Sequence, residues 1–369
     1  MNPTIAESIS NRLPSLERCD RIQIGLGDVL LHAAGFEDRT MAAVDSIQPE
    51  PGARALLLDY RPANPKNRLE ELRDALLRCG VAVEDQDILV YDRFDPGDFE
   101  NRLMTRLTAV GAKRVILDIS TMSKLAILLS LGVILVLNLE VILLYAEALS
   151  YGPTREEFEE AKKNNEIHRP TIQIFTGVHG VVRVGSLASV AMQGQPTAAL
   201  VFMSFNDALT QVLLNTVYPS RLFLINSRPP IHSWREGATA WIHDQVRREW
   251  EEDNPLEMPP SGEGPVPKRS VSTLEYRETV SMLMDLYWKL SPTHRVLLAP
   301  AGSKLQAVGC FIAKALHPDI HVEYPSPDGF LPQYSSGVAN RWIVRFGKLK
   351  ELLNTISVRE RQEFLELAG

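Results

Sequence analysis

Short apolar runs alternate with longer amphipathic stretches along most of the chain. This alternation is typical of βα units, in which helices join consecutive strands of a mainly parallel sheet. In the first half, the runs predict strands at 29–33, 55–60, 88–91, 115–119 and 141–145. The helical periodicity between them predicts helices at 40–46, 66–79, 98–110 and 123–136.

The second half continues in the same way. Strands are expected at 198–203, 222–225, 295–299 and 320–324. Helices are expected at 206–215, 236–250, 273–290 and 304–316. Segment 171–184 fits either a pair of strands or a wing-like insertion. Segment 253–270 is rich in proline and glycine, which predicts a loop.

The most apolar stretch, 125–149, resembles a membrane span at first sight. However, Asn138 and Glu140 divide it into about 13 apolar residues and a shorter β-like run. Neither part reaches the roughly 18 residues that a membrane-spanning helix requires. We therefore interpret the stretch as a buried helix followed by a buried strand.

Three segments recur in the same order in both halves. VILDISTMSKLAILLSL (115–131) matches RVLLAPAGSKLQAVGCF (295–311), each with a strand, a loop ending in Ser-Lys and an apolar helix. LLLDYRPAN (56–64) resembles LFLINSRPP (222–230), and GFED (35–38) lies against SFND (204–207). The repeat predicts an α/β protein with two Rossmann-like, mainly parallel sheets in tandem, related by pseudo-two-fold symmetry.

The repeat also predicts the domain organisation. An N-terminal extension is expected at 1–20 and the first Rossmann-like unit at 21–169. The second unit is expected at 170–350, with the loop 253–270 inside it. A C-terminal helix would cover 351–369.

The composition restricts the partners and the cellular location expected for the protein. The net charge of −7 argues against an extended nucleic-acid surface, which needs clustered basic residues, but it permits a small anion in a local basic pocket. Three scattered cysteines form neither a disulfide framework nor a metal site, and the histidines lack metal-ligand spacing. The polar N-terminus has no apolar signal core. We expect a cytoplasmic protein with no membrane partner, no cofactor and no metal.

The two Ser-Lys loops are the main candidates for binding. A loop that runs from the carboxyl end of a parallel strand into a helix offers free N–H groups and the positive end of the helix dipole. Hydroxyls could add hydrogen bonds to an oxyanion, and a lysine could add a mobile charge. The candidates are Ser120, Thr121, Ser123 and Lys124 in the first loop and Gly302, Ser303 and Lys304 in the second. The alternative is that each serine caps its helix and each lysine is solvated.

Two further residues lie near the same predicted sheet edges. Arg39, in GFEDR, could reach a phosphate, although the neighbouring acids fit a capped helix start equally well. Asn206, at the matching edge of the second half, could hydrogen-bond a base or a ribose.

The segment DISTMSK (118–124) resembles the Asp/Asn-x-Thr/Ser-x-x-x-Lys loop of the CARF family, the CRISPR-associated Rossmann-fold sensors of cyclic oligoadenylates. Two such units in one chain also resemble the SAVED domains of bacterial anti-phage signalling systems. The resemblance implies a nucleotide second messenger across the pseudo-two-fold axis, with one Ser-Lys loop from each half on its phosphates. The family's Gly-Gly pair is replaced by Thr121-Met122 in the first loop, and only Gly302 remains in the second.

Three functions follow as hypotheses. The first is a cytosolic regulatory module of anti-phage defence that senses an anionic nucleotide. Its output would need an effector protein as partner, because no effector domain is evident in this sequence. The second is a metal-independent phosphodiesterase, similar to a ring nuclease, in which a ribose 2′-OH attacks the adjacent phosphate. The third is a ligand-free scaffold for protein interactions. The sequence assigns no catalytic residue, so it does not decide whether the protein is an enzyme.

Overall fold

The computed structural model describes residues 4–166, 172, 174–253, 269–331 and 335–368. The chain forms two compact units, and each is described here by itself. The seven-stranded unit comprises Asn11–Tyr151 and Ser335–Gly369. The five-stranded unit comprises Met1–Ser10 and Gly152–Tyr334.

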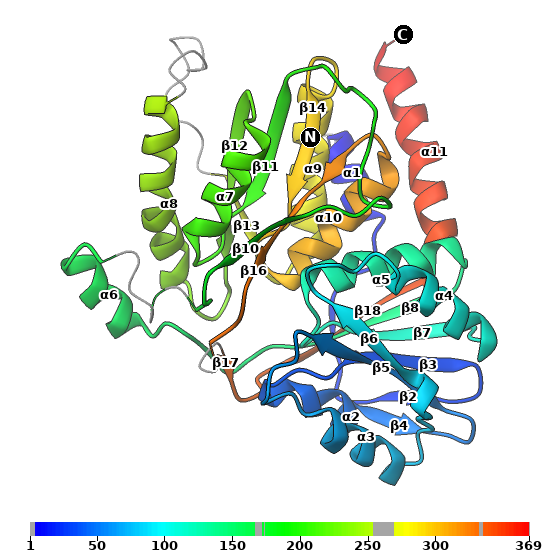
Figure 1. Cartoon of the computed structure of the whole chain (residues 1–369). Coiled ribbons are helices and arrows are strands. Elements are labelled where there is room, and N and C mark those ends of the chain that lie inside the picture. Colours follow the sequence, from blue (N-terminus) through cyan, green and yellow to red (C-terminus); the bar gives the residue numbers. More distant parts are fainter. Residues whose placement is uncertain (1–3, 167–171, 173, 254–268, 332–334, 369) are drawn as a thin grey trace. The chain divides into compact units, whose positions relative to one another are not determined.

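The seven-stranded unit is built on five parallel strands. In chain order they are β3 (Asp28–Ala33), β5 (Arg54–Arg61), β6 (Ile88–Asp92), β7 (Arg114–Asp118) and β8 (Glu140–Ala146). They lie in the order β8-β7-β3-β5-β6, and two antiparallel strands, β18 (Arg341–Lys348) and β1 (Glu17–Arg18), extend the β8 edge. Its helices are η1 (Asp38–Met41), α2 (Ala42–Ser46), α3 (Leu69–Arg78), η2 (Asp85–Asp87), α4 (Phe99–Ala109), α5 (Lys124–Val136) and α11 (Leu349–Ala368). Figure 1 shows α4 and α5 on one face of the sheet and α2 and α3 on the other.

Small strand pairs complete this unit. They are β2 (Ile22–Ile24) with β4 (Ile47–Pro49), and β9 (Ser150–Tyr151) with β17 (Ser335–Ser336).

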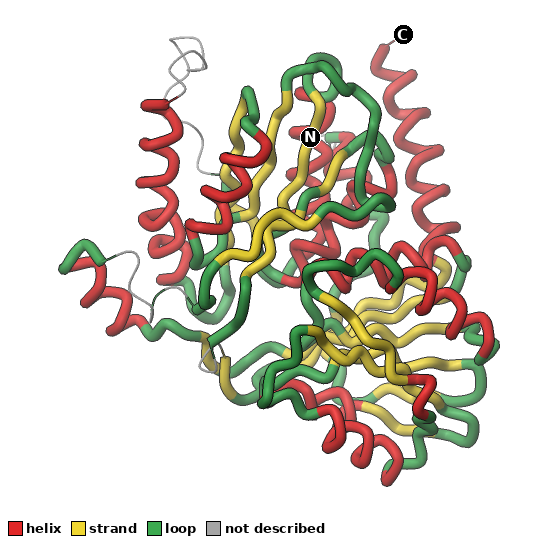
Figure 2. Tube along the Cα trace, in the orientation of Figure 1, coloured by secondary structure: helices red, strands yellow, loops and turns green. Residues whose placement is uncertain are grey.

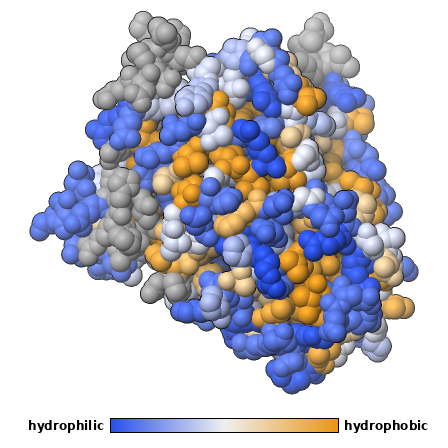
Figure 3. Space-filling view, viewed as in Figure 1, coloured by the Kyte–Doolittle hydropathy of each residue, from blue (hydrophilic) through white to orange (hydrophobic). Residues whose placement is uncertain are grey.

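The five-stranded unit has an entirely parallel sheet. Its strands are β11 (Thr197–Phe202), β12 (Arg221–Arg228), β13 (Ser270–Ser272), β14 (Arg295–Ala299) and β15 (His321–Val322), in the order β13-β12-β11-β14-β15. Its helices are α6 (Arg155–Lys163), α7 (Asp207–Val217), α8 (Trp234–Asp253), α9 (Tyr276–Leu290) and α10 (Lys304–Leu316), and α1 (Ile5–Asn11) begins in it. β10 (Val178–Val182) pairs with β16 (Tyr324–Pro327), and apolar surface gathers near this pair on the face shown in Figure 3.

Both parallel sheets have the same strand order. Counted along the chain, the strands of each lie in the order third-second-first-fourth-fifth, which is the Rossmann order. The strands that precede the two Ser-Lys loops, β7 and β14, are therefore both the fourth strand and lie beside the first. The alternation of strands and helices that the sequence predicts is confirmed in both units (Figure 2). Pseudo-two-fold symmetry stays a prediction.

The predicted domain boundaries differ from the observed units. The sequence predicts one contiguous segment for each unit, but β18 returns from residue 341 to pair along the length of β8 in the seven-stranded sheet. This pairing satisfies the backbone of an otherwise open edge. Segment 171–184 contributes β10 to a two-stranded antiparallel pair rather than a hairpin of its own. Most of the predicted loop 253–270, at 254–268, lies outside the described residues. Its last residue, Ser270, instead begins β13, which pairs with β12 in the five-stranded sheet.

The apolar stretch 125–149 folds as predicted. α5 is followed by β8, and Asn138 takes a left-handed conformation (φ 53°) in the turn between them. Within the described ranges, no helix is both long and apolar enough to cross a membrane.

Candidate functional site

The loops after β3 and β7 leave the seven-stranded sheet side by side at its carboxyl edge, because these two strands are neighbours. The chain crosses to opposite faces of the sheet there, which is where ligands of open α/β sheets bind. The loops approach closely at Gly35, where a Cβ atom would lie 2.8 Å from the Cβ of Thr121. A larger residue at position 35 would therefore force the two loops apart.

Ser123 begins α5 as its N-cap. Its Oγ accepts a hydrogen bond from the amide of Ala126 at 3.2 Å, and its own amide donates to Tyr60 Oη at 2.7 Å. Burial raises the pKa of Tyr60 to about 12, so the phenol stays protonated at neutral pH. The capping role that the sequence left open for Ser123 is thus observed, while a role in ligand binding stays a prediction.

Lys124 is the first residue of α5, and its side chain is partly exposed. Burial lowers the pKa of its ammonium to about 8. Among the residues that the structure describes, none forms an ion pair or hydrogen bond with this ammonium. Lys124 is therefore a poorly solvated cation to which no described residue supplies a counter-charge.

Ser120 anchors its loop through internal hydrogen bonds. It donates its amide and its hydroxyl to Asp118 and accepts the amide of Ala146 at 2.8 Å. Asp118 also lies 2.8 Å from Nδ1 of the buried His32. Burial favours the neutral acid, but His32 and Ser120 outweigh it and keep the pKa of Asp118 below its usual value.

Thr121 is also engaged internally, because its hydroxyl donates to the carbonyl of Ala33 at 2.8 Å. Two of the hydroxyls that the sequence offered to an oxyanion, on Ser120 and Thr121, thus have partners within the protein.

Arg39 points inward rather than towards the loop surface. It is 1% exposed, pairs with Glu37 and donates to the carbonyl of Ala146 at 3.1 Å. Burial alone would lower the pKa of Arg39, but Glu37 and the tyrosines Tyr145 and Tyr151 raise it above its usual value. In this structure the Arg39 guanidinium therefore has internal partners, the Glu37 carboxylate and the Ala146 carbonyl.

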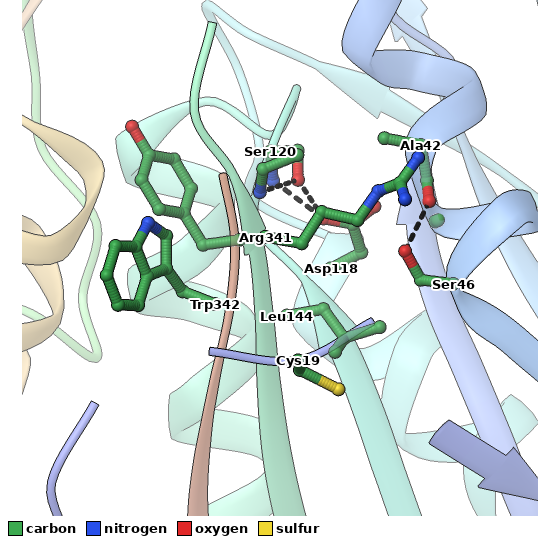
Figure 4. Close-up of a pocket in the computed structure, with 11 residues that line it drawn as sticks. Cys19, Ala42, Ser46, Asp118, Ser120, Leu144, Arg341 and Trp342 are labelled. Atoms are coloured by element: carbon green, nitrogen blue, oxygen red, sulfur yellow. Dashed lines mark hydrogen bonds between the residues drawn. The ribbon is translucent and has the colours of Figure 1, made fainter. Parts of the chain in front are cut away.

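Figure 4 shows a pocket in the seven-stranded unit, lined in part by Asp118 and Ser120. Arg341 and Trp342 enter it from β18, which the sequence did not predict to join this sheet. The pocket measures about 230 Å³ with open solvent included. Sites for small organic ligands usually measure about 300–1,000 Å³, so this pocket is too small for a nucleotide.

The matching loop in the five-stranded unit has a different interior. Ser303 caps α10, accepting the Gln306 amide at 3.1 Å and donating its hydroxyl to the carbonyl of Thr273 at 2.7 Å. Its own amide donates to Gln306 Oε1 at 2.7 Å. Lys304 is the first residue of α10 and is partly exposed.

Asn206 lies at the carboxyl edge of β11, the strand beside β14. It is the N-cap residue of α7, but its side chain makes no capping bond. The residue is 1% exposed, and its Oδ1 accepts no hydrogen bond from the described part of the chain. A buried carboxamide of this kind could recognise a base edge only if the loop opened.

The described residues contain no cluster of three or more potential metal ligands from His, Cys, Asp and Glu.

Fold and site together define a Rossmann-like α/β protein with two parallel sheets of equal strand order and a Ser-Lys helix start beside the first strand of each. Comparison with family models and with curated proteins finds no match. Among solved structures, one similar chain is the UDP-GlcNAc 2-epimerase from Neisseria meningitidis bound to UDP-GlcNAc. The two are 12% identical over 83% of this chain and 73% of that chain, with a TM-score of 0.19. A TM-score this low carries no argument about function.

Proposed function

We propose that this protein is a binding module for an anionic nucleotide, with the Ser-Lys loop of the seven-stranded unit as its phosphate site. The observation that carries the proposal is the position of Lys124. Its ammonium lies at a helix start beside the first strand of a Rossmann-like sheet, and no described residue supplies the opposite charge.

This position is unfavourable for a lysine in the absence of a ligand. The N-terminus of a helix carries partial positive charge, which repels a cation by about 0.3–1 kcal/mol. Desolvation adds to this cost. A bound phosphate would offset both costs, and it would also meet the free N–H groups of the first turn.

The resemblance of DISTMSK (118–124) to the CARF loop supports a nucleotide as the source of the phosphate. In that role the protein would be a cytosolic regulatory module of bacterial anti-phage defence that senses a cyclic oligonucleotide. An effector protein would then be the partner that responds to the ligand.

A second candidate is a ligand-free interaction scaffold. The internal hydrogen bonds of Ser120, Thr121 and Ser303 favour it, because these hydroxyls need no ligand to be satisfied.

Calorimetric titration with pyrophosphate and with cyclic di- to hexanucleotides tests the proposal. Lys124→Met should weaken binding about ten- to a hundred-fold, since a charge-assisted contact contributes about 1.5–3 kcal/mol. Lys350→Met is the matched control, because Lys350 is an exposed lysine in the first turn of α11. Unchanged binding in Lys124→Met would refute the proposed site.

Chromatography of the titrated nucleotides separates the remaining functions. An intact ligand supports a sensor, whereas slow conversion that stops in Lys124→Met supports a metal-independent phosphodiesterase. No binding of any compound by folded wild-type protein leaves the scaffold.

A further inference from the structure

The helix starts of α5 and α10 are completed by different side chains. In each, the amide of the capping serine donates to a polar side-chain oxygen at 2.7 Å. The acceptor is Tyr60 Oη for Ser123 and Gln306 Oε1 for Ser303. The serine amide at the helix start therefore donates to a phenol oxygen in the seven-stranded unit and to a carboxamide oxygen in the five-stranded unit.

These partners come from corresponding places in the two folds. β5 and β12 each have eight residues, and Tyr60 and Ser227 are the residues before the last. Ala126 and Gln306 are each the third residue of a 13-residue helix. A large strand residue thus accompanies a small helix residue in the seven-stranded unit, and the sizes are reversed in the five-stranded unit.

The two arrangements present opposite polarity to an incoming anion. Tyr60 keeps its own O–H, which lies 3.4 Å from the carbonyl oxygen of Thr121, a long hydrogen bond. A phenol is both donor and acceptor, so it can accept from the Ser123 amide while its proton turns from this long contact towards an oxyanion.

Gln306 Oε1 can only accept hydrogen bonds. It already accepts one from Ser303 and a second, at 3.1 Å, from the hydroxyl of Ser227. The carboxamide is fully buried, and its nitrogen lies 3.3 Å from the carbonyl of Ser272. Its lone pairs would repel a phosphate at this helix start.

Gly302 is explained by the same carboxamide. A Cβ atom at this position would lie 2.1 Å from Gln306 Oε1. The absence of a side chain at residue 302 thus makes room for Gln306, rather than for a ligand as the sequence suggested.

We infer that Gln306 closes the Ser-Lys loop of the five-stranded unit to anions, so that each chain binds its anion only at the loop of the seven-stranded unit. The part of this inference that places the anion at the loop of the seven-stranded unit rests on the proposed function. The inference departs from the two equivalent phosphate contacts that the family resemblance implies.

The test is the stoichiometry of pyrophosphate binding, measured by calorimetry. We expect one site in the wild-type protein and no site of comparable affinity in Lys124→Met. Gln306→Ala should have two sites, and Lys124→Met/Gln306→Ala should have one. In the double variant any binding comes from the opened loop alone.

Gln306→Ala removes a buried cap, so thermal melting must show that it folds. Should it fail to fold, Ser227→Tyr/Gln306→Ala rebuilds the arrangement of the seven-stranded unit in its place. Gln306→Glu keeps the capping oxygen and should leave the loop closed. A folded Lys124→Met/Gln306→Ala protein without a site would overturn the inference.

A wild-type protein with two sites, one of them lost in Lys304→Met, would overturn it as well. The proposed function fails separately. If the wild-type protein has no site and the double variant has one, Gln306 closes its loop as inferred, but Lys124 is not an anion site.

Discussion

Replacing Lys124 by methionine should stabilise the folded protein at neutral pH while weakening anion binding. The lysine pKa falls from an ordinary 10.5 to about 8 because the ammonium is poorly solvated. At about 1.4 kcal/mol for each pH unit, this gap sets a ceiling of about 3 kcal/mol on the cost of keeping the charge at pH 7. The side chain is partly exposed and solvent screens part of that cost, so we expect a gain of about 1–2 kcal/mol.

The pH dependence identifies the charge as the cause. Between about pH 8 and 10.5 the unfolded chain still binds the lysine proton after the folded chain has lost it, so the stability of the wild-type protein rises with pH in this window. Methionine does not titrate. The advantage of Lys124→Met should therefore be complete below pH 8 and should vanish towards pH 10.5.

Urea unfolding followed by circular dichroism at pH 7, 8.5 and 10 measures this difference. Lys350→Met is the control for the loss of a lysine at an exposed position. Saturating pyrophosphate should raise the midpoint of the wild-type protein only. A Lys124→Met protein that is less stable at pH 7, or whose advantage is the same at all three values, would refute the electrostatic reasoning.

Three further predictions concern the rest of the molecule. Burial lowers the pKa of His243 to about 4. At pH 5 the free energy of unfolding should therefore be about 2 kcal/mol lower than at neutral pH, because the unfolded chain binds this proton more readily. Denaturant titrations should show that this acid sensitivity disappears in His243→Gln. Gly35→Ala should lower the free energy of unfolding, measured in urea, by about 1–3 kcal/mol. If the new methyl group clashes with the Cβ of Thr121, Thr121→Ser should not restore the stability, because serine keeps this atom. A chain ending at residue 334 should lose the native fold of the seven-stranded unit, because β18 would be absent. Hydrogen exchange of the β8 amides measures this loss, and full protection of β8 would contradict the prediction.

The alternation of apolar runs and helices predicted the parallel strands of the two main sheets except β13, because each βα unit is a local pattern. β13 was missed because it is only three residues long, Ser-Val-Ser, and has no apolar run. The predicted bounds of β14 and α10 agree with the structure to the residue. β18 was missed because its pairing is non-local: residues 341–348 join a strand about 200 positions earlier. Nothing in the segment RWIVRFGK specifies which sheet it extends, so the discontinuous units could not be predicted from the periodicity.

The candidate site was predictable in position but not in detail. The order of strand, loop and helix along the chain, with the Ser-Lys pairs, predicted a helix start after a strand in each half, and the structure has one there. Whether a polar side chain turns outward or inward depends on partners that are distant in sequence. Arg39 turns inward because Ala146, 107 residues away, offers a buried carbonyl.

The comparison of the two loops suggests why a shared dipeptide is a poor guide to shared function. Ser-Lys specifies only how a helix begins, because the serine caps and the lysine follows it. The chemistry that a ligand would meet is set by the residue that reaches the serine amide, which is a phenol from the second strand in one unit and a carboxamide from the helix itself in the other. Gln306 requires a glycine at 302, because a Cβ atom there would lie 2.1 Å from its Oε1, and it accepts a further hydrogen bond from Ser227. Two identical Ser-Lys helix starts can therefore differ in what they offer an anion, according to the side chains around the serine amide.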